Sequence, residues 1–290
     1  MSDHHQPYSS EALSARVRRY VLASAYALRP RRSHLLPRLG RLTCEWLFQP
    51  ERARRRLARA EPRDTHELVA VVDDLSVETM IAGFRSGSYP LAHAYPMKWW
   101  APDMRAVIDP TNAHIDKNTR RILRQGKWRF SFDRDFIGVL QGCADPEIRK
   151  VPLTWLSPRM QQAFFKLHEA GYAHSVEVRD EAGELIGGLF GVTVGGVFFG
   201  QSQFMRQRDA SKAAVAVLHR HLAHWGFKVR DGQRMTSHLA SLGFSSMPRA
   251  EFEALIQQNV DRDLKAPWSF DPNLDIANWD RADAEPAASA

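Results

Sequence analysis

Apolar residues recur along the chain with the periods of helices and strands, and these periods predict its elements. A spacing of three to four residues predicts helices over 77–86, 116–126, 157–171, 210–225 and 249–257, with a short helical turn over 237–242. Ser76 and Asp209 stand where side chains cap two of these helices. Alternating patterns predict strands over 174–178, 184–204 and 227–231, and the middle stretch folds back on itself because Gly195-Gly196 tolerates the positive φ of a hairpin turn.

Prolines and aromatic residues replace this periodicity between residues 90 and 110. Four prolines frame Tyr95, Trp99 and Trp100 there. Proline has no backbone N–H, and it keeps the preceding residue out of the helical region. This stretch is therefore predicted to be extended and rich in turns.

The two ends of the chain differ from this body. Residues 1–66 hold prolines between short helical stretches and carry 14 basic against 6 acidic side chains, so a net +8 sits there in a chain of net +7. We predict a basic N-terminal extension; an organelle transit peptide, also rich in Arg and poor in acid, ranks second. Residues 261–290 carry 7 acidic and 3 basic side chains with three prolines, which predicts an acidic tail lying as a loose strap.

Composition excludes several classes of protein. A chain of 290 residues with 44% hydrophobic and 25% charged residues is globular and long enough for a sizeable core. No window approaches the ~20 apolar residues that cross a membrane, and no secretory signal is visible. Cys44 and Cys143 are too few for a disulfide framework or a cysteine zinc site. We therefore expect a cytoplasmic protein without a membrane partner.

A basic stripe runs along the predicted helix 116–126. Its members are spaced i, i+3, i+4 and i+7 and so share one face: Lys117, Arg120, Arg121 and Arg124. Such a stripe is commonly a solvated helix face, and it can also be a track for phosphates. The spacing alone favours the solvated face.

Few local motifs indicate chemistry. The glycines from 187 to 196 lie within a hairpin and cannot form a dinucleotide fingerprint. The three histidines of helix 210–225 have no Cys, Asp or Glu one turn away to complete a metal set, so no metal is expected. Asp231 and Gln233 are two residues apart at the end of a strand, so both side chains could contact one ligand. Asp-Gly is also a common turn sequence, and the local sequence alone favours this second interpretation, a plain turn that ends the strand.

A series of short motifs follows in one order over roughly two thirds of the chain. They are Asp74-Leu75, Gly87-Ser88-Tyr89-Pro90, Trp99-Trp100-Ala101-Pro102-Asp103-Met104-Arg105, His114-Ile115, Thr154-Trp155, Leu167-His168, His174-Ser175-Val176-Glu177, Gly187-Gly188-Leu189-Phe190-Gly191, Ala210-Ser211-Lys212, Asp231-x-Gln233, His238-Leu239-x-Ser241-Leu242-Gly243 and Pro248-Arg249. In this order and spacing they resemble the leucyl/phenylalanyl-tRNA–protein transferases of bacteria. The chain is identified as a divergent member of that family.

The resemblance implies a fold and an activity. The fold is α+β, with a small N-terminal α/β domain over 67–150 and a larger GCN5-related acyltransferase-like domain over 151–260. The activity is transfer of Leu, Phe or Met from aminoacyl-tRNA to the α-amino group of proteins that begin with Arg or Lys, which marks them for degradation in an N-degron pathway. Aminoacyl-tRNA is the co-substrate, no further cofactor is implied, and we expect a monomer.

The resemblance also implies roles for individual residues. Asp231 would orient or deprotonate the incoming amine, Gln233 would hydrogen-bond the reacting carbonyl region, and Gln201 occupies the third catalytic position. An apolar pocket for the aminoacyl side chain maps onto positions that are equally good core positions, and both interpretations stay open: Leu189, Phe198, Val215, Leu218 and Leu222. The tRNA contacts would be Trp155 and Leu91, at positions near the terminal adenosine, and the basic stripe of Lys117, Arg120, Arg121 and Arg124.

Three departures from the family pattern cluster around these positions. The family's Phe-Pro-Trp is Tyr89-Pro90-Leu91 here, its Gly-Glu-Ser-Met-Phe-Ser is Gly200-Gln201-Ser202-Gln203-Phe204-Met205, and its Asp-Cys-Gln is Asp231-Gly232-Gln233. Gln201 keeps the shape of the glutamate and loses its charge. The alternatives are therefore a paralogue with another acceptor or amino acid, or a non-catalytic RNA-binding or regulatory relative. An acetyl-CoA-dependent acyltransferase ranks lower, because no pyrophosphate-binding loop precedes Ala210.

Overall fold

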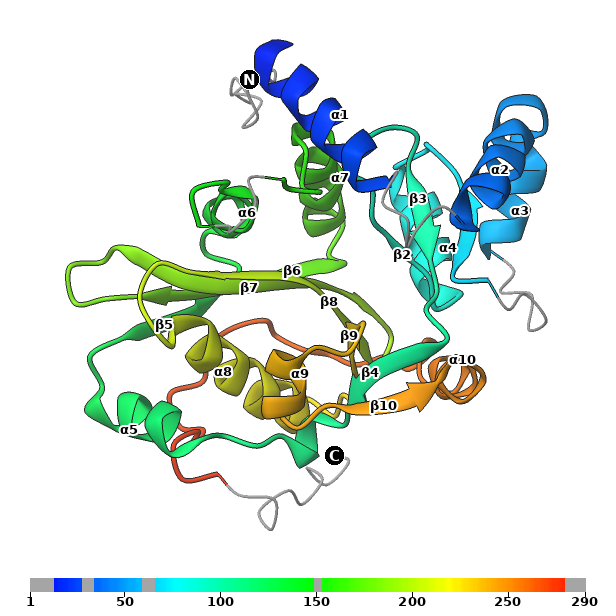
Figure 1. Cartoon of the computed structure of the whole chain (residues 1–290). Helices are drawn as coiled ribbons and strands as arrows, with labels where there is room; N and C mark the ends of the chain where they lie inside the picture. The colour runs from blue at the N-terminus through cyan, green and yellow to red at the C-terminus, as the bar shows by residue number, and fades with distance from the viewer. Residues whose placement is uncertain (1–12, 28–33, 59–65, 149–152, 280–290) are drawn as a thin grey trace, which may run out of the picture. The chain divides into compact units, whose positions relative to one another are not determined.

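The computed structural model describes residues 13–27, 34–58, 66–148 and 153–279, which divide into two compact units (Figure 1). The first unit takes the described residues up to Ala101 together with those of 144–167, and the second takes 102–143 and those from His168 onward. The units are thus interleaved along the chain, whereas the predicted segments are consecutive. The division into extension, small domain, catalytic domain and tail stays a prediction.

The first unit combines helices with a small antiparallel sheet of strand order β1-β3-β2. Its elements are α1 (Leu13–Ala27), α2 (Leu36–Phe48), α3 (Pro50–Ala58), β1 (Leu68–Val71), α4 (Val77–Arg85), β2 (Tyr89–Pro90), β3 (Lys98–Trp100) and most of α7 (Pro158–Glu169).

Part of the predicted basic extension belongs to the core of this unit. Leu42 of α2 packs against Leu68 and Val71 of β1, and Leu57 of α3 is only 1% exposed. The buried Arg38 donates a hydrogen bond from Nε to the carbonyl of Leu68 at 2.6 Å. Helices α2 and α3 are therefore not a separate arm. Two of the prolines between the short helical stretches predicted in residues 1–66, Pro30 and Pro62, lie outside the described residues.

The second unit is built on a seven-stranded sheet of order β10-β4-β9-β8-β7-β6-β5. Neighbouring strands are antiparallel except for β8 and β9, which run parallel. Helix α8 crosses one face of this sheet over the main hydrophobic core (Figure 1). The elements are β4 (Met104–Ile108), the 3-10 turn η2 (Pro110–Asn112), α5 (Lys117–Gln125), β5 (Arg129–Phe132), α6 (Phe136–Ala144), β6 (Ala173–Arg179), β7 (Leu185–Val194), β8 (Val197–Met205), α8 (Ala210–His224), β9 (Val229–Gln233), α9 (Ser237–Ser241), β10 (Ser245–Pro248) and α10 (Arg249–Gln257).

These helices and strands confirm the predicted α+β class and many predicted elements. The Ser76 side chain accepts from the backbone N–H of Thr79 and caps α4, as expected. The hairpin of β7 and β8 turns at Gly195, whose φ is 58°. Helix α8 begins after Asp209 as predicted, but that carboxylate makes no cap; it accepts a hydrogen bond from the side-chain amide of Asn118 at 2.7 Å.

The prediction of a loose C-terminal strap is wrong for the described residues 261–279. Trp268 stacks on His174 with ring centroids 3.7 Å apart, and Trp279 is 3% exposed within the main core. The backbone N–H of Asp271 donates to Nε2 of the buried His221 at 3.0 Å. The strap is therefore a packed part of the second unit, and residues 280–290 lie outside the described residues.

Candidate active site

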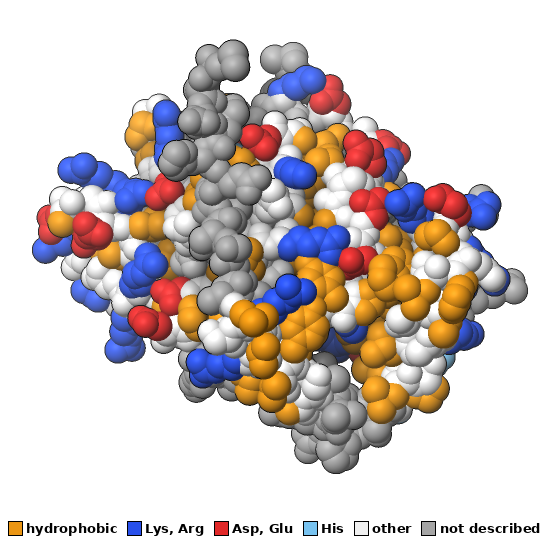
Figure 2. Space-filling view, turned by 90° about the horizontal axis from the view of Figure 1, so that it is seen from above, with side chains coloured by type: hydrophobic (Ala, Val, Ile, Leu, Met, Phe, Trp, Pro, Cys, Tyr) orange, Lys and Arg blue, Asp and Glu red, His pale blue; other side chains and the backbone are white. Residues whose placement is uncertain are grey.

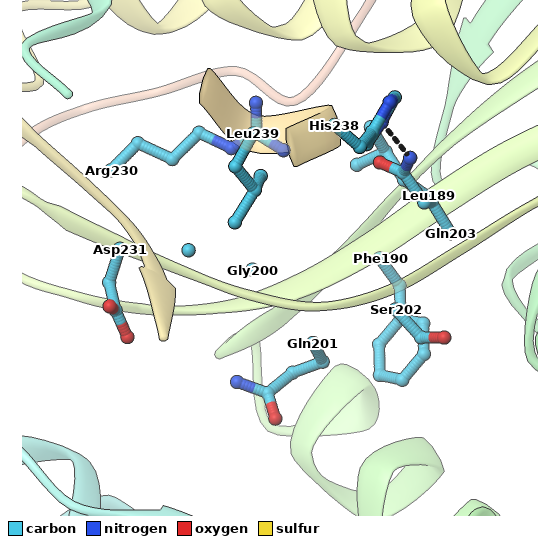
Figure 3. Close-up of a pocket in the computed structure, with 11 residues that line it drawn as sticks. Leu189, Phe190, Gly200, Gln201, Ser202, Gln203, Arg230, Asp231, His238 and Leu239 are labelled. Atoms are coloured by element: carbon cyan, nitrogen blue, oxygen red, sulfur yellow. Dashed lines mark hydrogen bonds between the residues drawn. The ribbon is translucent and has the colours of Figure 1, made fainter. Parts of the chain in front are cut away.

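The parallel strands β8 and β9 separate beyond Phe199 and Asp231, the last residues that pair them. Each strand carries a β-bulge at this point: Gln201 is the extra residue in β8, opposite β7, and Gly232 is the extra residue in β9, opposite β4. Bulges break a ladder locally and re-aim side chains, and they are frequent next to active sites. A cavity of about 190 Å³ opens here, lined by Leu189, Phe190, Gly200, Gln201, Ser202, Gln203, Arg230, Asp231, Gly232, His238 and Leu239 (Figure 3).

Asp231 is held by an arginine that the sequence analysis did not single out as a site residue. The carboxylate is 0% exposed and accepts two hydrogen bonds from Arg105, from Nε at 2.8 Å and from Nη2 at 2.7 Å. Its Oδ1 also accepts from the backbone N–H of Gln233 at 2.8 Å. With these bonds the carboxylate fixes the end of β9 rather than standing free in the cavity.

The two glutamines predicted as catalytic lie on either side of the strand separation. Gln233, with a φ of 67°, donates from Nε2 to the carbonyl of Gly200 at 3.0 Å, which ties β9 to β8. Gln201 donates from Nε2 to the carbonyl of Phe199 at 3.2 Å. Its Oε1 is buried without a hydrogen-bond partner and belongs to the cavity wall. Gln201 therefore offers an acceptor to a ligand.

Arg230 and His238 line the opposite side of the cavity, above Gly200 in Figure 3, whereas Gln201 and Asp231 lie below it. Burial lowers the pKa of Arg230 to about 9, so it remains charged at neutral pH. Burial also lowers the pKa of His238, and the nearby cations lower it further. Gln203 donates to Nε2 of this neutral His238 at 2.6 Å.

The predicted aminoacyl pocket is mostly packed core. Leu189 lines the cavity. The other four positions belong to the core under α8 and are at most 1% exposed: Phe198, Val215, Leu218 and Leu222. The core interpretation thus describes these four, whereas Leu189 fits both interpretations.

The basic stripe on α5 divides into two pairs. Arg120 donates to the carbonyl of Ala277 at 2.9 Å and Arg124 to Oδ1 of Asn278 at 2.8 Å, so this pair holds the strap. Lys117 and Arg121 are exposed. Figure 2 shows another side of the molecule, from above, where Lys and Arg are interspersed with Asp and Glu.

The remaining predicted tRNA positions lie in the first unit. Trp155 is 8% exposed and packs edge-on against Phe164, with ring centroids 5.8 Å apart. The carbonyl of Leu91 accepts a hydrogen bond from the indole of Trp100 at 2.8 Å. Within the part of the chain that the structure describes, no three His, Cys, Asp or Glu side chains are grouped to hold a metal, and no helix is long and apolar enough to cross a membrane.

Arg105 and Arg230 are the site residues that sequence reasoning missed. Arg105 stands in one of the quoted motifs, but nothing local pairs it with a carboxylate 126 residues away. Arg230 precedes Asp231 directly, so the alternation of a strand could have placed it on the opposite face of the sheet.

Comparison with known proteins shows the family of the chain. The family model for "Leucyl/phenylalanyl-tRNA protein transferase" matches residues 107–257. A protein of Azotobacter vinelandii named leucyl/phenylalanyl-tRNA–protein transferase is 43% identical to this chain, and the match covers 69% of this chain and 88% of that protein. A protein of the same name from Pseudomonas syringae is 41% identical, and the match covers 71% of this chain and 90% of that protein. The solved structure of L-PGS from Bacillus licheniformis matches with a TM-score of 0.33 and 14% identity over 64% of this chain and 63% of that one, a likeness too weak to carry an argument. On the family model and these relatives, the chain belongs to the leucyl/phenylalanyl-tRNA–protein transferase family.

Proposed function

We propose that the protein is an aminoacyltransferase that moves Leu, Phe or Met from aminoacyl-tRNA to the α-amino group of proteins beginning with Arg or Lys, as part of an N-degron pathway of protein degradation. The observation that carries the proposal is family membership at 43% identity over 88% of a relative. The cavity at the bulges of β8 and β9 supports it, because Gln201 and Asp231 line this cavity and Gln233 donates a hydrogen bond to the carbonyl of Gly200 in its wall. We further propose a cytoplasmic monomer that needs aminoacyl-tRNA and no other cofactor.

The reaction depends more on positioning the amine against the ester carbonyl than on a strong general acid or base. The nitrogen of the α-amino group attacks the ester carbonyl carbon, a C–N bond forms, and the C–O bond to the terminal ribose breaks. The proton lost by the amine ends on the ribose hydroxyl, so atoms and charge balance. An α-amino group has a pKa of about 7.7 to 8.0 and is partly neutral at pH 7, and holding two reactants together supplies a large part of the rate.

Three side chains take different parts in this step. The free Oε1 of Gln201 accepts a hydrogen bond from the attacking amine. Gln233 lies at the opening between β8 and β9, where its amide is suited to the reacting carbonyl region. Asp231 orients this end of β9 through Arg105 and the Gln233 backbone, a positioning role that its buried ion pair favours over deprotonation of the amine. Leu189 contributes to the aminoacyl pocket.

For tRNA binding we propose the exposed members of the α5 stripe, Lys117 and Arg121. Arg120 and Arg124 contribute by holding the strap in place. Trp155 and Leu91 are proposed only on their family positions, because in this structure Trp155 is largely buried.

A transfer assay tests the proposal. The purified chain is incubated with tRNAs charged with Leu, Phe or Met and with peptides that differ only at the N-terminal residue, and the products are weighed by mass spectrometry. We expect the mass of one aminoacyl residue on the Arg and Lys peptides. Absence of transfer to every peptide from every charged tRNA refutes the proposed function, and unchanged transfer by Asp231→Ala refutes the role given to that residue.

A second candidate is the same chemistry with a different acceptor. It is favoured by Gln201, which stands where the family has a glutamate and so lacks the charge that attracts a cationic N-terminus. Transfer to peptides with neutral N-terminal residues at rates above those for Arg and Lys would support it.

A further inference from the structure

The cavity contains a buried cation on the side where the aminoacyl side chain is expected. Arg230 is in parallel register with Phe198, so both side chains point to the α8 face of the sheet. The guanidinium lies over the ring of Phe244, 5.3 Å from its centroid, and close to Gly200 of the cavity wall. Leu189, the one predicted pocket position that lines the cavity, belongs to the same wall as Arg230. Arg230 therefore lines the cavity on the side proposed for the aminoacyl side chain.

No described carboxylate forms a salt bridge with this cation, although the charge of the neighbouring Asp231 favours its protonated form and raises its pKa. Its Nη1 contacts Nε2 of His219, a neutral ring that is 1% exposed and whose pKa is lowered by burial and by Arg230 itself. The adjacent Asp231 is engaged by Arg105. Among the residues that the structure describes, none forms an ion pair with Arg230, and its Nε is buried without a hydrogen-bond partner.

The surrounding wall is only partly apolar. Leu189 and Leu239 face the cavity beside the hydrogen-bonded pair of Gln203 and His238 (Figure 3). The Nε of Arg230 already lacks an acceptor, and a purely apolar ligand would supply none. A ligand with an oxygen at this depth would accept a charge-assisted hydrogen bond from the guanidinium, and a carboxylate would also form an ion pair with it.

We propose that Arg230 is a specificity-determining residue that lets the pocket accept an aminoacyl side chain ending in a carboxamide or carboxylate oxygen, alongside Leu, Phe and Met. Glutamine, asparagine, glutamate and aspartate have such side chains. This inference rests on the proposed function and leaves its chemical step unchanged: the ester C–O bond breaks, the C–N bond forms, and the amine proton goes to the tRNA hydroxyl. It concerns only which donors enter.

Competition between charged tRNAs tests the inference. The full chain receives tRNAs charged with Leu, Phe, Gln and Glu at equal concentrations and one Arg-initiated peptide, and the products are counted by mass. We expect Gln or Glu products from the wild type, and at least a tenfold fall in their ratio to Leu and Phe products in Arg230→Met. The matched control is Lys228→Met, which removes an exposed charge two residues earlier and should leave the ratio unchanged. The separate Gln and Glu arms distinguish carboxamide from carboxylate.

The outcomes of this assay separate the inference about Arg230 from the proposed function. Products of Leu or Phe alone from the wild type, or an unchanged ratio in Arg230→Met, overturn the inference while the proposed function stands. No transfer from any donor refutes the proposed function, and the inference falls with it. If Arg230→Met does not fold by circular dichroism, Arg230→Gln replaces it, which removes the charge and keeps a hydrogen-bond donor: a lower ratio of Glu to Leu products supports the inference, and unchanged ratios of both Gln and Glu to Leu products overturn it.

Discussion

The ion pair of Arg105 and Asp231 makes a quantitative prediction about stability. Both side chains are at most 1% exposed, and two short hydrogen bonds join them. Removing one partner of such a pair leaves an uncompensated buried charge and costs about 3–5 kcal/mol, whereas replacing both with apolar groups is often nearly neutral. We therefore expect Arg105→Met and Asp231→Leu each to lower the free energy of unfolding of the second unit by about 3–5 kcal/mol.

Urea denaturation of the two single variants and the double variant measures the coupling. With a slope of about 1–3 kcal/mol per molar urea, each single change should lower the midpoint of the second unit by roughly 1 M or more. The double variant should recover at least about 2 kcal/mol relative to the sum of the single effects. Additive losses would show that the two charges do not depend on each other and would remove the basis for the positioning role of Asp231.

Three further predictions follow from other contacts. Burial lowers the pKa of His221 to about 4. As the pH falls from about 6.5 toward that value, the unfolded chain binds a proton that the folded chain does not, and the free energy of unfolding should fall by up to roughly 3 kcal/mol. A His221→Phe variant that loses as much stability in acid, measured by chemical denaturation at a series of pH values, would contradict this. Neutralising the exposed Lys117 and Arg121 should reduce the slope of log affinity for tRNA against log salt by about 1 per contact. An unchanged slope in a filter-binding assay would show that neither side chain contacts tRNA phosphates. Gln201→Glu should raise the transfer rate to Arg peptides over that of the wild type, because it supplies a negative charge near a cationic N-terminus. A lower rate would contradict the proposal that the acceptor N-terminus binds beside residue 201.

Apolar periodicity and capping residues predict helices whose sequence determinants lie within the helix itself or next to its ends. Helix α10 occupies the predicted residues 249–257, and α5 begins after Asp116, whose side chain caps it, and ends at Gly126, whose φ is 65°. Periodicity, a cap and a glycine suffice there, because each acts within one or two turns. The hairpin of β7 and β8 was predictable for the same reason.

Elements defined by distant partners escaped prediction. All four residues of β1 are buried, so it shows no alternation. Strand β10 is mostly exposed and short of apolar residues, and it is a strand only because it pairs with β4, some 140 positions earlier in the chain. The strap is another case: its prolines and acids suggested a loose tail, but Trp268 packs against aromatic rings of β5 and β6 and against Trp225, the residue that follows α8.

The candidate site shows the same limit more sharply. Asp231, Gln233 and Gln201 were found through the resemblance, but the argument that Asp231 and Gln233 face one side assumed a regular strand, and the bulge at Gly232 breaks that alternation. Whether Asp231 acts as a base depends on Arg105, and the polarity of the cavity proposed for the aminoacyl side chain depends on Arg230. Both arginines act through burial and through contacts across the sheet, which raise the energetic importance of a charge far above its value in solvent. A motif records which residues are present at such a site, whereas their charges and partners, which decide the chemistry, emerge only when the strands are placed side by side.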